Sequence, residues 1–191
     1  RSYDLAANFL EKANLQVDNL DDLIVDLLDV SRLQSGKLQL HLAQFDFDEL
    51  VRETAESCEA IGTHRIEIKG ATGTQVYADK MRIEQVLNNL LSNAIKYSPR
   101  SDKVVVKLSY DKDQVKCSVE DFGIGISGSS LRLLFQRFYR AENVAKTFSG
   151  LGIGLYISSE IIKKHHGHLW VDSVEGKGST FTFTLPVEPP K

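Results

Sequence analysis

The chain has 191 residues, 42% of them hydrophobic and 26% charged, which is the balance of an ordinary soluble globular protein. Its 23 basic and 26 acidic residues give a net charge of −3, which argues against a dedicated nucleic-acid-binding protein. The two cysteines, Cys58 and Cys117, lie in separate periodic segments, which favours small buried residues in a reducing compartment over a disulfide.

A long helical pattern without Pro or Gly runs from residue 3 to about residue 34. About 30 residues at roughly 1.5 Å each extend further than a domain of this size buries, so we expect the helix to pair with another helix, a second copy of the chain, or both. Gly36 is expected to end it. Because the sequence begins at Arg1 inside this pattern, we expect a fragment of a longer protein, and any membrane anchor would lie outside this chain.

Short elements are predicted after the long helix. Leucines alternate with other residues over 38–42, which predicts a half-buried strand. Asp46 or Asp48 can cap a helix running from about 48 to 60. Short strands are then marked by branched apolar residues: Ile66, Ile68 and Val76.

The segment 83–97 is the most informative stretch of the chain. Its apolar residues recur at helical spacing and predict an amphipathic helix that Ser98-Pro99 ends. The face opposite the apolar stripe carries two amides, an ammonium group and an aromatic ring: Asn89, Asn93, Lys96 and Tyr97. Amide oxygens suit a hard Mg²⁺ ion, lysine suits a phosphate and tyrosine suits a flat base. The alternative is a solvated helix face rich in Asn and Lys.

The second half of the chain alternates strands with tight turns and adds a helix from Tyr156 to about His165. Strands are predicted at four places: 104–108, 115–119, 170–171 and 181–185. A hairpin turn at 111–113 joins the first two strands. Because tight turns join neighbouring strands, we expect an α/β sandwich, with a mixed or mostly antiparallel sheet and helices on one face.

A carboxylate, Asp121, stands at a predicted strand end and is followed by Gly123 and Gly125. A buried carboxylate accepts a hydrogen bond from an exocyclic amine, which selects adenine over guanine, and the glycines let the backbone approach a ligand. The alternative is an ordinary turn that contains an Asp. Asp-Phe-Gly also occurs in protein kinases, but their His-Arg-Asp and Val-Ala-Ile-Lys motifs are missing from this sequence.

Three alternating glycines, Gly150, Gly152 and Gly154, precede the last helix. Their backbone N–H groups at a positive helix end can hold phosphate, although glycines that serve helix packing are the alternative. Leu155 occupies the position of the third glycine of a dinucleotide-binding motif and excludes that motif.

A pair of arginines, Arg137 and Arg140, flanks two aromatic residues. One interpretation is a mobile lid that brings a cation onto a terminal phosphate. The alternative is that both are surface arginines beside a docked aromatic pair. The histidines of 165–168 fit the basic end of a helix better than a metal site.

Together these motifs resemble those of the sensor histidine kinases, in the same order and over nearly the whole chain. The segment 89–97 resembles their N box, and 121–125 resembles their first glycine box. Three further matches are to the F box, the second glycine box and the terminal strand motif: 135–140, 150–155 and 176–181. The resemblance implies the left-handed α/β sandwich called the Bergerat fold, shared with type II topoisomerases and with mismatch-repair and heat-shock chaperone ATPases.

The resemblance also implies a role for each matching residue. Asn93 would be the Mg²⁺ ligand, and Asn89 would support the metal or the phosphates. Lys96 would contact phosphate, and Arg140 would stabilise the transferring γ-phosphate. Asn89 stands where the ATPases carry a Glu that activates water, so the resemblance favours phosphotransfer over hydrolysis.

The adenine would lie beside Tyr97, with its amino group on Asp121 and Ser179 nearby. The rest of the ATP site would come from the two glycine boxes: Gly123, Gly125, Gly150, Leu151, Gly152, Gly154 and Leu155.

The long first helix resembles the second helix of the dimerisation and histidine-phosphotransfer domain, so the implied division is 1–36 and a catalytic domain at 37–188. The acceptor box is missing, because no His lies on the first helix and none precedes Glu or Asp. We therefore expect ATP binding without autophosphorylation.

In the parent protein the resemblance implies a homodimer, a response regulator partner, a cytoplasmic location and an anchor in the inner membrane only through another segment. The rival interpretations are a Bergerat-fold ATPase and a non-catalytic nucleotide-sensing module.

Overall fold

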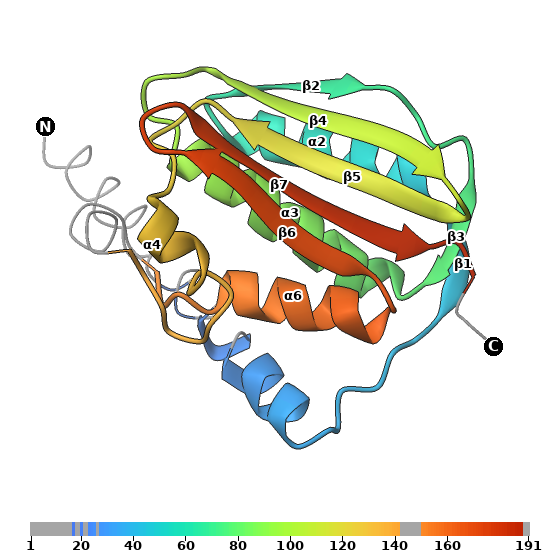
Figure 1. Ribbon diagram of the computed structural model, residues 1–191. Helices are drawn as coiled ribbons and strands as arrows, with labels where there is room; N and C mark the ends of the chain where they lie inside the picture. The colour runs from blue at the N-terminus through green and yellow to red at the C-terminus, as the bar shows by residue number, and fades with distance from the viewer. Residues whose placement is uncertain (1–16, 18–19, 21–22, 26, 142–149, 189–191) are drawn as a thin grey trace, which may run out of the picture. The chain divides into compact units, whose positions relative to one another are not determined.

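The computed structural model describes residues 17, 20, 23–25, 27–141 and 150–188 (Figure 1). The chain divides into two compact units, Arg1–Leu38 and Gln39–Lys191, which are treated separately. In the described residues of the first unit, 27–34 are helical and Gly36 ends the helix as predicted. Gly36 has φ +67°, its N–H donates to Leu33, and the N–H of Lys37 donates to the Arg32 carbonyl at 2.9 Å. This pair of bonds is the Schellman motif, which favours glycine at the left-handed position. The predicted helix before residue 17 lies outside the described residues.

The second unit contains two sheets and a layer of helices. Its strands are β1 (Ala43–Asp46), β2 (Arg65–Lys69), β3 (Gln75–Ala78), β4 (Lys103–Asp111), β5 (Gln114–Asp121), β6 (His168–Val174) and β7 (Gly178–Pro186). Its helices are α2 (Phe47–Ile61), α3 (Lys80–Lys96), the short α4 (Gly128–Leu131) and α6 (Gly154–Lys164). No helix among the described residues is both long and apolar enough to cross a membrane.

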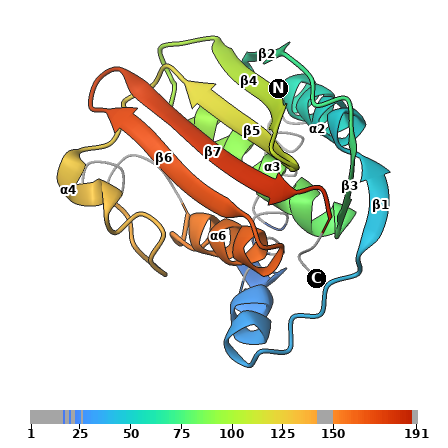
Figure 2. The same ribbon diagram turned by 45° about the vertical axis from the view of Figure 1, so that its right-hand side comes forward.

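The main sheet has five strands in the order β2-β4-β5-β7-β6. The β2–β4 pair is parallel and the other pairs are antiparallel. Figures 1 and 2 show α2, α3 and α6 on one face of this sheet. The expected mostly antiparallel α/β sandwich is therefore confirmed.

The core lies between the sheet and these helices because both contribute apolar faces at their own periodicities. Every second residue of the central strands points inward, as in the row formed by Cys117, Phe183 and Leu169. Helix α3 buries the apolar stripe that the sequence indicated: Ile83, Val86, Leu87, Leu90, Leu91 and Ala94. Cys117 is buried and Cys58 half-buried, and both are free thiols.

Of the two residues predicted as possible caps of helix α2, one is its N-cap. Asp46 is the N-cap, and its Oδ1 accepts from the Glu49 N–H at 2.9 Å. Asp48 instead accepts hydrogen bonds from the Thr72 and Gly73 N–H groups, which lowers the pKa of its carboxyl despite the opposing effect of burial. The two candidate residues therefore have separate tasks, a helix cap and a loop anchor.

The strand predicted over 38–42 is wrong, because regular pairing begins at Ala43. The His41 N–H donates to Asp79 Oδ2 at 2.9 Å, so this N–H binds a side chain and joins no sheet ladder. From Ala43 onward the chain pairs with β3, with Ala43 opposite Ala78. The leucine alternation was real, but backbone partners decide where a strand forms.

The predicted hairpin between β4 and β5 is present. Its two central residues, Lys112 and Asp113, have φ of +49° and +62°. Positive φ at both positions is typical of the type I′ turn, whose twist matches that of paired strands.

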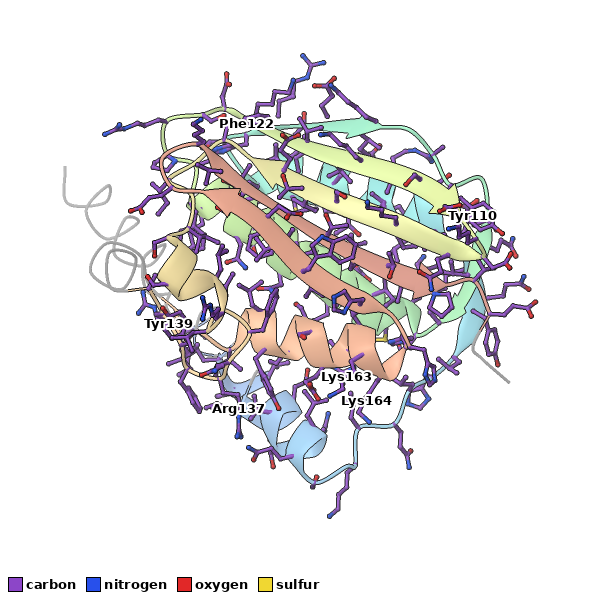
Figure 3. The ribbon with its side chains drawn as sticks, in the orientation of Figure 1. Tyr110, Phe122, Arg137, Tyr139, Lys163 and Lys164 are labelled. Atoms are coloured by element: carbon purple, nitrogen blue, oxygen red, sulfur yellow. The ribbon has the colours of Figure 1, made fainter. Side chains whose placement is uncertain are left out.

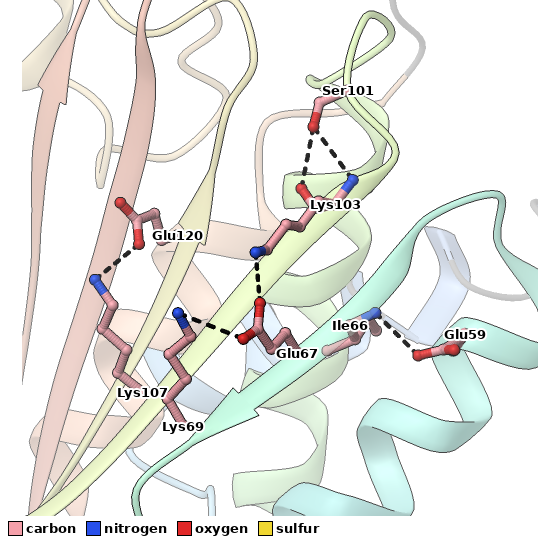
Figure 4. Close-up of polar contacts among 8 residues, drawn as sticks. All are labelled: Glu59, Ile66, Glu67, Lys69, Ser101, Lys103, Lys107 and Glu120. Carbon is pink, nitrogen blue, oxygen red and sulfur yellow. Dashed lines mark hydrogen bonds and ion pairs between the residues drawn. The ribbon is translucent and has the colours of Figure 1, made fainter.

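The open edge and the outer face of the sheet are polar (Figure 4). At the edge, the Ile66 N–H donates to Glu59 Oε2 at 2.9 Å, so a helix side chain covers one exposed donor of β2. On the outer face Lys107 lies 2.8 Å from Glu120, and Glu67 binds two lysines. These pairs are solvent-exposed, so water and salt screen them and they add little to stability.

Candidate functional site

Most of the site residues proposed from the sequence come from three places in the fold. These places are the C-terminal half of α3, the end of β5 with the turn after it, and the N-terminal end of α6. Figure 3 shows Phe122 and Tyr139 toward one end of the domain and Tyr110 toward the opposite end. Lys163 and Lys164 lie at the far end of α6, away from Tyr139.

The two asparagines of α3 are joined in one hydrogen-bonded chain. Asn93 Nδ2 donates to Asn89 Oδ1 at 3.2 Å, one helical turn away. Asn89 Nδ2 donates to the Ser158 hydroxyl of α6 at 2.8 Å, and Ser158 is almost fully buried. The chain orients both amides, because each donor now has a fixed partner. Sequence reasoning missed Ser158, whose only signal was its place one turn after Gly154.

Gly154 is required by this contact. A Cβ added at this position would collide with the Asn89 side chain. Gly152 has φ +71°, and its Cβ would lie 2.5 Å from the Tyr139 carbonyl oxygen. The helix-packing alternative therefore holds at Gly154, which meets α3, whereas Gly152 packs against the loop at Tyr139. It is compatible with an anion site, because in the described structure the N-cap residue Ile153 supplies no side-chain bond to the first turn of α6.

Asp121 is buried at the end of β5 and receives several hydrogen bonds. The Gly123 N–H donates to its Oδ1 at 2.9 Å, and the Ser98 hydroxyl lies 3.5 Å from the same atom. The backbone and hydroxyl of Ser179, opposite it on β7, also bind the carboxyl. Burial raises the pKa of Asp121, and these hydrogen bonds oppose the rise. Ser98 was expected only to end a helix, so its contact with the carboxylate is new.

The turn after Asp121 packs tightly against the end of α3. A Cβ at Gly123 would collide with the Tyr97 carbonyl oxygen, which accepts a hydrogen bond from the Ile124 N–H at 3.1 Å. Gly125 has φ +64°, and its Cβ would collide with the Val174 carbonyl. Glycine is therefore required at both positions, and the first glycine box is fixed against two neighbouring segments.

Lys96, Tyr97 and Arg140 form a cationic cluster beside the Asn pair. Lys96 Nζ lies 5.3 Å from the centre of the Tyr97 ring, and Tyr97 is the C-cap of α3 rather than part of the helix. Burial lowers the pKa of Lys96, and the Arg140 charge lowers it further. Burial raises the pKa of Tyr97, which Arg140 partly offsets. Two cations that repel each other in a half-buried place favour an anion beside them.

The loop before Arg140 places its two arginines differently. The Arg137 guanidinium lies over the Tyr156 ring of α6 at 5.6 Å, which agrees with the surface interpretation for that residue. Phe138 has φ +62°, is 59% exposed, and donates its N–H to the Gly152 carbonyl at 3.0 Å. This bond connects the loop to the second glycine box. Residues 142–149 of the expected lid lie outside the described residues.

His165, at the C-cap of α6, binds main-chain groups through both ring nitrogens. Its Nδ1 lies 2.8 Å from the Ile161 carbonyl, and its Nε2 accepts from the Asp79 N–H at 3.0 Å. Burial lowers the pKa of His165. The ring therefore ties the end of α6 to the start of α3 as a neutral imidazole.

Comparison with known proteins agrees with this geometry. The model of the family "Histidine kinase-, DNA gyrase B-, and HSP90-like ATPase" matches residues 78–189. The circadian input-output histidine kinase CikA of Thermosynechococcus vestitus is 34% identical over 96% of this chain and 27% of its own length. The sensor histidine kinase WalK of Bacillus subtilis is 33% identical over 96% of this chain and 31% of its own length. A crystal structure of full-length ShkA in complex with AMPPNP has a TM-score of 0.76 and 28% identity, and covers 91% of this chain and 37% of that chain.

The chain therefore belongs to the histidine kinase-, DNA gyrase B- and HSP90-like ATPase family. The relatives reported above are named histidine kinases, and this chain spans about a third of the length of the curated ones. Within the family the chain contains the ATP-binding catalytic domain of a sensor histidine kinase.

Proposed function

We propose that this domain transfers the γ-phosphoryl group of ATP to a histidine on a helix of the parent protein, for relay to an aspartate of a response regulator. The observation that carries the proposal is the convergence of a buried carboxylate, two oriented amides, two cations and a glycine-rich helix N-terminus in one unit. The motifs match those of the histidine kinases, and the relatives' names agree.

The adenine is assigned to Asp121. Its carboxylate is buried and held by Gly123 and Ser179, so it offers an oriented acceptor to the 6-amino group. Tyr97, half-buried beside the same turn, supplies a flat surface for the base. The similar structure of ShkA is a complex with AMPPNP, which agrees with an adenine nucleotide.

The phosphates are assigned to the glycine-rich start of α6 and to the cationic cluster. The backbone N–H groups come from residues at or just before the positive end of the α6 dipole: Gly150, Leu151, Gly152, Gly154 and Leu155. The cluster cations provide charge, and the catalytic role on the γ-phosphate is assigned to Arg140 of this set because guanidinium binds phosphate in a bidentate manner.

Mg²⁺ fits the amide pair. Asn93 donates its Nδ2 to Asn89, so Asn93 Oδ1 is the atom that offers lone pairs to a metal. Among the described residues, no cluster of three or more His, Cys, Asp or Glu side chains could hold a metal ion. Phosphate oxygens would therefore complete the coordination, and the ion would neutralise charge that develops on the phosphates.

The side chain at 89 favours phosphotransfer over hydrolysis. An amide cannot remove a proton from water, and Asn89 Nδ2 is already bound to the Ser158 hydroxyl. We assign to Asn89 the task of holding the metal ligand Asn93 in place. A family ATPase is the weaker alternative for this reason.

The first unit is proposed to be part of a dimerisation helix, with the catalytic domain at 37–188 as the sequence indicated. Six large apolar side chains of this helix are at least 46% exposed: Val17, Leu20, Ile24, Val25, Leu27 and Leu28. Such a stripe favours a partner helix in a homodimer. We propose a cytoplasmic location, with any membrane anchor in another segment of the parent protein.

Calorimetric titration tests the nucleotide assignment. Wild type should bind ATP with Mg²⁺, and Asp121→Asn should bind about 10–100-fold more weakly, because a hydrogen bond to a charged group contributes roughly 1.5–3 kcal/mol. Asn93→Ala should weaken binding only when Mg²⁺ is present. Asp172→Asn is the matched control, since Asp172 is exposed on the same sheet and should leave binding unchanged. Equal affinities for the two Asp variants would contradict the adenine assignment.

A second assay tests the transfer itself. With labelled ATP the chain should not label itself, and it should label an acceptor helix that carries the histidine and is supplied in trans. Arg140→Ala should lower this rate by about 10²–10³-fold. ATP binding without any transfer to the helix would favour the nucleotide-sensing alternative.

A further inference from the structure

A row of three polar residues crosses the sheet beside the proposed adenine site. Asp121 on β5 pairs with Ser179 on β7, and Ser179 pairs with Ser173 on β6. The row lies on the helix-covered face, because Val119 and Phe181, two residue pairs further along the same strands, point to that face and belong to the core. The three strands lie side by side in Figures 1 and 2.

Ser173 makes three hydrogen bonds to two other segments, the start of β7 and the stretch before α4. Its Oγ lies 3.0 Å from the Ser179 hydroxyl and 2.8 Å from the Gly178 carbonyl. It also accepts from the Ile126 N–H at 2.9 Å. A hydroxyl has one proton and two lone pairs, so Ser173 accepts from the Ile126 N–H and shares its single proton between the Gly178 carbonyl and the Ser179 oxygen.

The direction of the bonds is set by Asp121. The Ser179 hydroxyl donates its only proton to this carboxylate, so the Ser179 oxygen is left as an acceptor for Ser173. The bonds therefore run from the Ile126 N–H through Ser173 and Ser179 to the carboxylate. Each donor in this chain orients the next, which makes the final bond to Asp121 dependent on Ser173.

The segments that Ser173 joins are already packed against each other. The Gly176 N–H donates to the Ile124 carbonyl at 2.8 Å. A Cβ at Gly178 would collide with the Asp121 carbonyl oxygen, as a Cβ at Gly125 would with Val174. The turn between β6 and β7 thus lies directly on the turn that follows Asp121, and Ile126 stands just before Ser127 and α4. Two hydrogen bonds therefore separate Ser173 from the carboxylate.

We propose that Ser173 is a positioning residue for base selection: it holds the Ser179 hydroxyl on Asp121 and ties this pair to the backbone at the start of the α4 segment. The inference rests on the proposed adenine role of Asp121. It assigns to Ser173 no contact with the nucleotide. Its effect should therefore appear in the selectivity for the 6-amino group, since only that group uses the oriented carboxylate.

The test compares ATP with purine riboside 5′-triphosphate, which carries hydrogen in place of the 6-amino group. Wild type should prefer ATP, and Ser173→Ala should reduce the ratio of the two affinities about 3–10-fold, the value of one hydrogen bond of roughly 0.5–1.5 kcal/mol. Affinity for the analogue should stay the same. Ser173→Thr keeps the hydroxyl and should restore the ratio, and Ser173→Cys, a weak donor of similar size, should behave as Ala does.

Ser118→Ala is the matched control. Ser118 accepts from the Thr182 hydroxyl at 3.0 Å, in a buried hydroxyl pair on the outer face of the same sheet. Its loss should lower stability without changing the affinity ratio. A purely structural Ser173 would lower both affinities equally or neither, and this result overturns the inference. A wild type that does not distinguish the two nucleotides overturns the adenine assignment, and the inference falls with it.

Discussion

Gly154→Ala tests whether the second glycine box is shaped by packing as well as by phosphate. The added Cβ would collide with Asn89 Oδ1 and lie 3.0 Å from its Cγ. Asn89 must then move, which disturbs its bond to Ser158 at 2.8 Å and the bond from Asn93 at 3.2 Å. At roughly 0.5–1.5 kcal/mol each, the two bonds represent about 1–3 kcal/mol.

An opposing effect is the helix preference for alanine over glycine, which is at most about 1 kcal/mol. The loss should win, because two bonds outweigh one propensity term, and we expect a net destabilisation of about 1–2 kcal/mol. This corresponds to a decrease in Tm of roughly 2–8 °C. Urea unfolding measures the free energy directly. Gly128→Ala is the matched control, since its Cβ would meet nothing within 4 Å and it should not destabilise the domain.

The decisive measurement is a double-mutant cycle with Asn89→Ala. Without the asparagine there is nothing at this place to displace, so Gly154→Ala should become neutral or stabilising by up to about 1 kcal/mol. A change of sign between the two backgrounds would show that the Gly154 requirement is a contact with Asn89. If Gly154→Ala lowers the free energy of unfolding equally in wild type and in Asn89→Ala, this reasoning is refuted and the destabilisation comes from the backbone.

Three further changes follow from the contacts described above. His165 is neutral in the folded domain and its pKa is lowered by burial, so its contribution to stability is complete above the ordinary value of 6.5 and is lost as the pH falls below it. Urea midpoints at several pH values should show this slope in wild type, and His165→Gln should reduce it. Gly123→Ala should cost more than Gly154→Ala, because its Cβ meets the Tyr97 backbone, which cannot rotate away. A smaller loss than for Gly154→Ala in the same urea assay would contradict this ranking. Asp46→Ala should cost about 1 kcal/mol through the lost cap of α2, and thermal unfolding that matches wild type would disprove the cap.

Periodicity predicted the fold because burial repeats along the chain. Helix α3 and strands β4 to β7 each show one apolar face, and the sheet and helix layers follow from covering those faces. The strand at 38–42 failed because its leucine alternation carries no information on backbone partners. The His41 N–H binds Asp79, a residue 38 positions away, which local pattern cannot reveal.

Sequence alone suggests the candidate residues whose own side chain would contact the nucleotide. It does not suggest the residues that only orient those side chains. Asp121 and Asn93 stand out because their side chains have few structural uses at those positions. Ser98, Ser158 and Ser173 do not, because a serine in a helix or strand is common and its hydroxyl gains meaning only from the residue opposite. The sequence identifies the groups expected to touch a nucleotide, and the fold identifies those that orient them.

Glycine gives the clearest case of two causes at one position. At Gly154 the absence of a side chain admits Asn89, while the same residue opens α6 at its positive end. A phosphate site and a helix contact both require glycine there, so the motif alone could not separate them. The structure places the amide chain of Asn89 and Asn93 directly against the helix start. If phosphate binds at that start, the packing contact and the anion site act together: the glycine that lets the two helices approach also brings the metal-binding amide beside the phosphates.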